Sequence, residues 1–198
     1  MPQKSSPQVR RFLPLILFAV VAIVIAVVVV LPRLQSSSTA SIGGAFALQD
    51  KTGKTVTDQD FRGKLMLVYF GYTYCPDVCP TTLGMMGQAL DKLTPDERKQ
   101  VASLFITVDP ERDTQKVIGD YAANFAPDLV GLTGTPDAIQ SVEHEYHVYA
   151  QKHVEKDGSY SMDHSSIIYI MGKDGQYRGI LSGEVTIAQL VDGIRKQL

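Results

Sequence analysis

Cys75 and Cys79, the two cysteines of the chain, are its most chemically reactive residues. They lie four positions apart in "GYTYCPDVCP" (Gly71 to Pro80), and a proline follows each of them. Two thiols at this spacing could act as a redox pair, as a structural disulfide or as two ligands of a soft metal. A structural disulfide would close a very short loop and add little stability, which favours a functional pair.

The two prolines constrain the backbone around the thiols. Because the α region is disfavoured for a residue before proline, we expect neither cysteine to lie within a helix. Cys79 is predicted as the N-cap of the following helix, with Pro80 as its first residue, so that residues 75–79 form a loop. An exposed loop of this kind allows both a reversible disulfide and joint metal binding. The nearby helix N-terminus is expected to lower the pKa of the Cys79 thiol and favour thiolate.

Strand and helix patterns alternate along the chain around this loop. Strands are predicted at residues 46–50, 65–70, 104–109, 129–134, 166–171 and 177–181, and helices at residues 81–93, 114–125, 135–148 and 186–198. Thr135 is expected as an N-cap with Pro136 at the first helical position. A final hairpin and helix after this alternation predict an α/β fold, a thioredoxin-like mixed sheet flanked by helices.

Two thiolates are an incomplete site for most metals, so a third ligand is expected from another segment. The chain has four histidines. His144 and His147 lie at i, i+3 on a predicted helix, where exposed, solvated side chains are the simpler interpretation. His153 lies in a charged stretch, "QKHVEKDG", with no supporting signal.

His164 carries the strongest signal of the four histidines. It precedes the strand predicted at residues 166–171, whose start a thioredoxin-like fold places against the cysteine loop. Its imidazole would complete a site with two thiolates, and Asp163 is a candidate second-shell acceptor for its ring. Met162 is a second soft atom nearby, although a methionine beside a core is usually packing.

An uncharged apolar run from Phe12 to Leu31 is long enough, at roughly 30 Å as a helix, to cross a bilayer. We predict a transmembrane signal anchor at residues 12–31, because basic residues precede it and a cleaved signal peptide would have a shorter run. Residues 1–11 are then a short cytoplasmic N-terminus. Residues 32–44 are expected to be a flexible tether, and residues 45–198 an exported domain.

Four motifs in order give the chain a close resemblance to the Sco/SenC family of membrane-anchored copper proteins. They are "FRGKLMLVYFGYTYCPDVCP" (Phe61 to Pro80), "VDPERDT" (Val108 to Thr114), "LTGT" (Leu132 to Thr135) and "DHSSIIYIM" (Asp163 to Met171). The resemblance covers nearly all of the chain from Gly43 onward. It implies a thioredoxin-like fold and a role in assembling the dinuclear copper centre of cytochrome c oxidase.

The resemblance also implies site residues. Cys75, Cys79 and His164 match the ligands that the family uses for copper, as Cu(I), Cu(II) or both. Asp109 matches a carboxylate that the family places near the site, although a cap at the end of a strand explains it equally well. Asp77 lies inside the cysteine motif and is a further second-shell candidate.

Three functions remain open at this point. The first is a copper metallochaperone, with the copper-bearing subunit of cytochrome c oxidase as acceptor and an unnamed copper donor. The second is a thiol-disulfide oxidoreductase that reduces the acceptor's cysteines before metallation, and the third is a copper or redox sensor. Thioredoxin-like oxidoreductases resemble one another in a C-x2-C pair and in a proline just before the strand that faces it. This chain has C-x3-C and no proline before the strand at residues 166–171, and both differences favour metal coordination over general thiol exchange.

The expected location follows from the anchor and the resemblance. We expect a bacterial inner membrane protein with its domain in the periplasm, or a mitochondrial inner membrane protein facing the intermembrane space. A formal net charge of -2 without a basic patch predicts no nucleic-acid partner.

Overall fold

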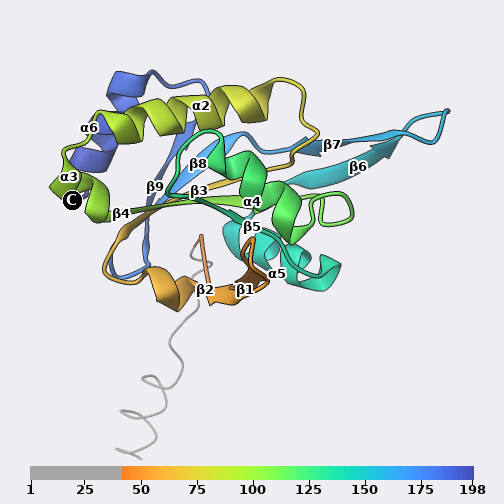
Figure 1. The fold of residues 1–198 in the computed structure, drawn as a ribbon, viewed down its shortest axis with the longest axis horizontal. Coiled ribbons are helices and arrows are strands. Elements are labelled where there is room, and N and C mark those ends of the chain that lie inside the picture. Colours follow the sequence, from red (N-terminus) through yellow and green to blue (C-terminus); the bar gives the residue numbers. More distant parts are fainter. Residues whose placement is uncertain (1–41) are drawn as a thin grey trace, which may run out of the picture. The chain divides into compact units, whose positions relative to one another are not determined.

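Strands and helices alternate along residues 42–198, the part of the chain that this computed structural model describes (Figure 1). The strands are β1 Ala47–Gln49, β2 Thr55–Thr57, β3 Leu65–Gly71, β4 Val101–Thr107, β5 Leu129–Leu132, β6 Ala150–Val154, β7 Tyr160–His164, β8 Ile167–Met171 and β9 Tyr177–Ser182. The helices are α2 Val78–Asp91, α3 Pro95–Lys99, α4 Gln115–Ala123, α5 Pro136–Tyr146 and α6 Ile187–Arg195, with a short 3-10 helix η1 at Asp58–Phe61.

The central sheet has five strands in the order β5-β4-β3-β8-β9. β3, β4 and β5 are parallel, whereas β8 and β9 run antiparallel to their neighbours. Helices α2 and α6 run along one side of this sheet, and α5 with the β1–β2 hairpin lies on the other (Figure 1). The predicted α/β architecture, a mixed sheet flanked by helices, is therefore confirmed.

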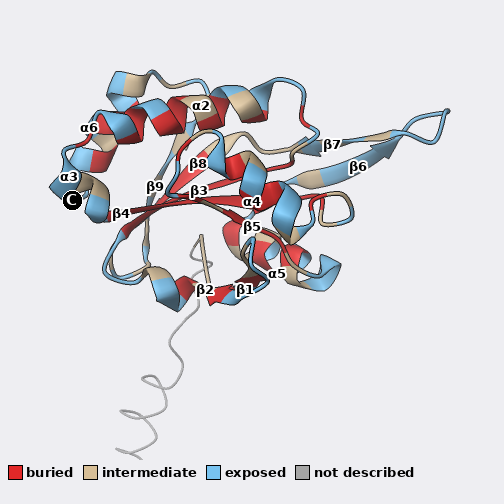
Figure 2. Cartoon of the chain, in the orientation of Figure 1, coloured by how far each residue is buried: buried red, intermediate tan, exposed pale blue. Residues whose placement is uncertain are grey.

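The core lies around β3 and β4, where every residue is buried (Figure 2). Strands covered on both faces are expected to be continuous apolar runs, which explains why these two segments could be predicted. Two carboxylates, Asp109 and Asp113, are nonetheless buried just beyond the C-terminal end of β4. Buried acids are rare unless they are paired, so this end of the sheet has polar organisation of its own.

The hairpin formed by β6 and β7 was not predicted. It extends away from the body of the domain (Figure 1), and its strands pair only with each other. Its register sets Ala150 opposite His164, so His164 ends β7 and lies at the base of the hairpin. The strand predicted at residues 166–171 is confirmed as β8, which begins at Ile167.

The predicted anchor and most of the predicted tether lie outside the described residues. Within residues 42–198, no helix combines the length and apolar character needed to cross a membrane. The last tether residues, 42–44, can be described, and they lie against the domain. There the Gly43 N–H donates to the carbonyl of Glu145 at 2.7 Å.

Candidate metal centre

Cys75, Cys79 and His164 come together at one place in the structure. Their possible ligand atoms all lie within 4.8 Å of one another, and Cys79 Sγ is 3.3 Å from His164 Nε2. Within residues 42–198 they form the only group of three or more such side chains with this spacing. The three residues expected from the sequence to share a site are therefore brought together.

The two cysteines lie on different kinds of backbone. Cys75 is in the loop after β3, whereas Cys79 is in the first turn of α2, which begins at Val78 with Asp77 as its N-cap residue. The prediction of Cys79 as N-cap and Pro80 as first helical residue was therefore wrong. Pro80 is tolerated at the third helical position because the first N–H groups of a helix have no partner within it.

Both thiols are also more enclosed than an exposed loop would allow. Cys79 is fully buried and Cys75 is 8% exposed, and the backbone N–H of Cys79 lies 3.4 Å from Cys75 Sγ. Burial raises the pKa of the Cys79 thiol, and a backbone hydrogen bond from Tyr72 opposes this effect only partly. The expected lowering of this pKa by the helix N-terminus was wrong, because desolvation dominates. Without metal, Cys79 is a neutral thiol near pH 7.

His164 presents its Nε2 lone pair to the thiols. Its other ring nitrogen, Nδ1, lies 3.2 Å from the carbonyl oxygen of Ser165, a contact that assigns the proton to Nδ1. The rings of Tyr69 and Tyr72 meet the imidazole edge-on, at 6.3 and 5.8 Å between centroids. Burial lowers the pKa of His164, so the imidazole is neutral near pH 7 and in the form that binds metals.

Asp163 does not support the His164 ring as expected. Its Oδ2 atom lies 2.9 Å from His153 Nε2, on the neighbouring strand β6. Successive side chains of a strand point to opposite faces, and Asp163 and His164 are consecutive in β7. The prediction that Asp163 is the acceptor for His164 was therefore wrong, and the Ser165 carbonyl takes that role.

The other predicted site residues surround the three without joining them. Asp109 pairs with Arg112 and accepts from the Tyr160 hydroxyl at 2.9 Å, so it does more than cap a strand. Asp77 makes no capping hydrogen bond from its side chain. The Met162 backbone N–H donates to the Tyr72 hydroxyl at 3.4 Å, and its side chain is partly buried against the core.

His144 and His147 are placed where the sequence suggested, at the C-terminal end of α5. His144 is in the last turn, and His147 is the C-cap residue in a left-handed conformation, with φ of 53°. Neither ring belongs to a group that could hold a metal ion among residues 42–198.

Gly71 makes room for the buried thiol, and sequence reasoning missed it. A Cβ atom built at Gly71 would lie 2.7 Å from Cys79 Sγ, closer than real Cβ contacts allow. Gly71 is the last residue of β3, and a glycine ending an otherwise apolar strand is the signal that could have indicated a close approach.

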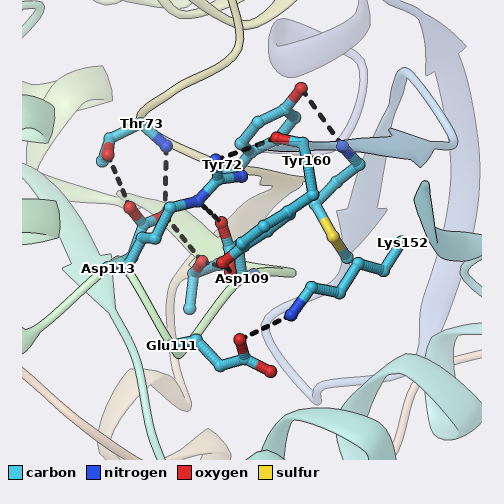
Figure 3. Close-up of polar contacts among 10 residues, drawn as sticks. Tyr72, Thr73, Asp109, Glu111, Asp113, Lys152 and Tyr160 are labelled. Atoms are coloured by element: carbon cyan, nitrogen blue, oxygen red, sulfur yellow. Dashed lines mark hydrogen bonds and ion pairs between the residues drawn. The ribbon is translucent and has the colours of Figure 1, made fainter. Parts of the chain in front are cut away.

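Asp113 is a second residue that sequence reasoning missed, and it anchors the start of the cysteine loop. It is fully buried and accepts hydrogen bonds from the backbone N–H and the hydroxyl of Thr73, and from the hydroxyl of Thr107 (Figure 3). Thr73 lies two residues before Cys75, and Thr107 ends β4. Asp113 thus fixes the cysteine loop to the sheet.

Replacing Asp113 should destabilise the domain in a way that depends on the substitute. Asp113→Ala leaves the Thr73 N–H and two hydroxyls without their acceptor and should lower the free energy of unfolding by about 3 kcal/mol. Asp113→Asn should cost less, because its amide oxygen can still accept from the Thr73 N–H and the Thr107 hydroxyl, and its amide nitrogen can donate to the Thr73 hydroxyl. Urea denaturation of both variants tests this, and equal losses would contradict the proposed role.

Comparisons with known proteins agree with this geometry. The sequence matches the family described as SCO1/SenC over residues 34–198. The protein SCO1 homolog 1, mitochondrial, of Arabidopsis thaliana is 39% identical over 163 residues, which is 82% of this chain and 49% of that protein. The human protein SCO1 homolog, mitochondrial, is 42% identical over 142 residues, 69% of this chain and 46% of that one. The chain spans about half the length of these curated relatives.

A solved structure shows the same fold. The structure of Bradyrhizobium japonicum ScoI with copper bound superposes with a TM-score of 0.74 at 42% identity, over 80% of this chain and 100% of that one. The family match covers most of the sequence, and it includes both cysteines and His164. On this ground the chain belongs to the SCO1/SenC family.

Proposed function

We propose that this protein is a copper metallochaperone that binds copper through Cys75, Cys79 and His164 and delivers it to the dinuclear copper centre of cytochrome c oxidase. The observation that carries the proposal is the convergence of two thiols and one imidazole nitrogen within 4.8 Å. The copper-bound ScoI relative, with which the chain shares fold and family, supports copper as the metal.

The ligand set suits Cu(I) in particular. Soft thiolates favour Cu(I), and an added imidazole lets the same site also hold Cu(II). Neutral His164 offers its lone pair without first losing a proton, because burial lowers the pKa of its ring. Both cysteines are buried and His164 is partly buried, so a copper ion held by the three residues would be largely kept away from water.

Delivery would follow from the predicted organisation of the chain. The anchor at residues 12–31 would hold residues 45–198 on the exported side of a bacterial inner membrane, or facing the mitochondrial intermembrane space. A tether at residues 32–44 would keep the domain near the copper-bearing subunit of the oxidase and within reach of a copper donor. Thiols of the acceptor would then replace Cys75, Cys79 and His164 by stepwise ligand exchange.

The Cu(I) affinity of the reduced protein should rise with pH through the neutral range. Burial raises the pKa of Cys79, so copper must displace the proton of this thiol, while His164 is already neutral. Below the pKa of the thiol, the observed affinity gains about ten-fold per pH unit for each proton released. Competition titrations with a Cu(I) chelator at several pH values measure the slope, and an affinity independent of pH would contradict copper binding at Cys79.

A thiol-disulfide oxidoreductase is the second candidate function. The observation that favours it is the asymmetry of the pair: both cysteines are free and close together, but only Cys75 is exposed at all. An accessible thiol can attack the acceptor's disulfide, and a buried neighbour can resolve the mixed disulfide. The raised pKa of Cys79 opposes this role, because the thiolate is the attacking form.

The two functions can be separated with the purified copper-bearing domain of the acceptor. Copper-loaded protein mixed with the reduced acceptor and then separated from it should leave copper bound to the acceptor, measured as its metal content, and a Cys75→Ser/Cys79→Ser double variant should transfer none. Copper-free, reduced protein mixed with the disulfide form of the acceptor tests the reductase. Disulfide reduction without any copper transfer would overturn the metallochaperone.

A further inference from the structure

We propose that Asp109, Arg112 and Tyr160 form a latch that positions His164, by fixing the β6–β7 hairpin to the loop that follows β4. The inference rests on the proposed function, because it assigns these residues an effect on copper that is exerted through His164. It makes them positioning residues, since none of them belongs to the group of possible metal ligands.

The latch joins the first residue of β7 to the segment after β4 (Figure 3). The Tyr160 hydroxyl donates to Asp109 Oδ1 at 2.9 Å, and Arg112 Nη1 donates to the Tyr160 carbonyl oxygen at 3.0 Å. Arg112 Nε closes the triangle by pairing with Asp109 Oδ2. Tyr160 is therefore held at its hydroxyl and at its backbone, and His164 lies at the other end of the same strand.

Arg112 also contacts the segment that carries the thiols. Its guanidinium carbon lies 3.7 Å from the centre of the Tyr160 ring, 4.6 Å from that of Tyr74 and 5.6 Å from that of Tyr72. Its Nη2 atom is buried and has no hydrogen-bond partner within residues 42–198, so these ring faces form much of its surroundings. Tyr74 directly precedes Cys75, so one side chain bridges the cysteine loop and the strand of His164.

Apart from the latch, the hairpin is tied to the domain through Met162, whose N–H donates to the Tyr72 hydroxyl and whose side chain packs against the core. The two strands of the hairpin belong to no larger sheet, and four of the five residues of β6 are exposed. An isolated two-stranded hairpin is at best marginally stable in water. The Lys152–Glu111 pair also ties the hairpin to the loop after β4, but both side chains are more than a third exposed, so solvent screens that pair.

The chemistry of the latch suits positioning better than stability. The Asp109 side chain is only 3% exposed, and a buried ion pair gains little net stability over apolar replacements. Its directional hydrogen bonds instead allow few arrangements of the groups they join. The Tyr160 hydroxyl is bonded to Asp109 and the Tyr160 carbonyl to Arg112. These two bonds limit where the strand, and with it His164, can lie.

Tyr160→Phe tests the latch, because it removes only the hydroxyl that reaches Asp109. In the reduced full-length protein it should weaken Cu(I) binding about ten-fold, as expected for a group that orients a metal ligand. The matched control is Tyr149→Phe, which removes an exposed tyrosine hydroxyl that donates to Gln151 near the base of the same hairpin. The control should bind Cu(I) like the parent. Arg112→Lys, a second variant that keeps the charge, should weaken binding in the same way as Tyr160→Phe.

The decisive comparison is made in a His164→Ala background. A latch that acts through His164 has nothing left to position there, so Tyr160→Phe should cause no further loss of Cu(I) affinity. An additional ten-fold loss in that background, or no loss in the parent, would overturn the latch. If His164→Ala itself left the affinity unchanged, the ligand set of the proposed function would fail, and the latch with it.

Discussion

His164→Ala should weaken Cu(I) binding by the reduced protein by about 100-fold or more, because loss of a group that merely orients a ligand already costs about 10- to 100-fold. Among residues 42–198, His164 is the only histidine grouped with the two thiols, and the variant leaves both thiols in place. It should therefore still form the Cys75–Cys79 disulfide. Competition titrations without oxygen measure the affinity, and thiol counting after mild oxidation measures the disulfide.

His153→Ala is the matched control for this experiment. His153 lies on the same hairpin, but it is exposed and pairs with Asp163, away from the thiols. It should bind Cu(I) as the parent does. If His164→Ala also kept the affinity of the parent, copper would be held by the thiols alone, and the three-ligand site would be wrong.

Oxidation of the two thiols should expel copper from the site. Forming the Cys75–Cys79 bond removes two electrons from the two copper-bound thiolates, which the oxidant accepts, so neither sulfur remains as a thiolate ligand. The sulfurs must also approach to about 2.05 Å of each other, which leaves no room for a metal between them. One equivalent of diamide added to the copper-loaded protein should release its copper to a chelator.

The His164→Ala variant is a useful comparison, because its weaker site should release copper at a lower chelator concentration than the parent. The parent must release copper in step with the loss of free thiols. Copper kept in full by protein whose thiols are fully oxidised would contradict thiolate ligation.

The sequence was informative wherever local pattern and tertiary structure agree. Two of the continuous apolar runs predicted as strands are strands in the structure, β3 and β8. The third, predicted at residues 104–109, is β4, which spans Val101–Thr107. Thr135 and Pro136 begin α5 as predicted, and the Thr135 hydroxyl accepts from the Ala138 N–H at 3.2 Å. These signals act within a few residues of one another and need no partner elsewhere.

The failures arose where distant partners decide the outcome. The preference imposed by Pro80 was overridden, because Cys79 is buried within the first turn of α2, beside Gly71 and His164. Strand β6 has no apolar alternation, and in β7 only Tyr160 and Met162 alternate with polar residues, so the hairpin was missed in the sequence. Within this hairpin Asp163 pairs with His153 and points away from His164. Had a strand been predicted at residues 160–164, the alternation of side chains along it would have placed Asp163 and His164 on opposite faces.

The sequence predicted that Cys75, Cys79 and His164 would lie together, but it did not reveal the residues that hold them in place. Cys75, Cys79 and His164 can be selected by residue type and by their places beside predicted strands. Asp113 could not be selected from the sequence, because its hydrogen-bond partner Thr73 lies 40 positions away. The same is true of Tyr160, which lies 51 positions from Asp109. Supports of this kind can be recognised only after the fold brings them together.

The most direct test of the copper site is X-ray absorption at the copper edge, on reduced protein loaded with one equivalent of Cu(I). The structure predicts two sulfur neighbours and one imidazole nitrogen, with the nitrogen contribution lost in His164→Ala. Two sulfurs without nitrogen in the parent would remove His164 from the site. Nitrogen and oxygen neighbours alone would show that the thiols of Cys75 and Cys79 do not hold the metal, and would contradict the account.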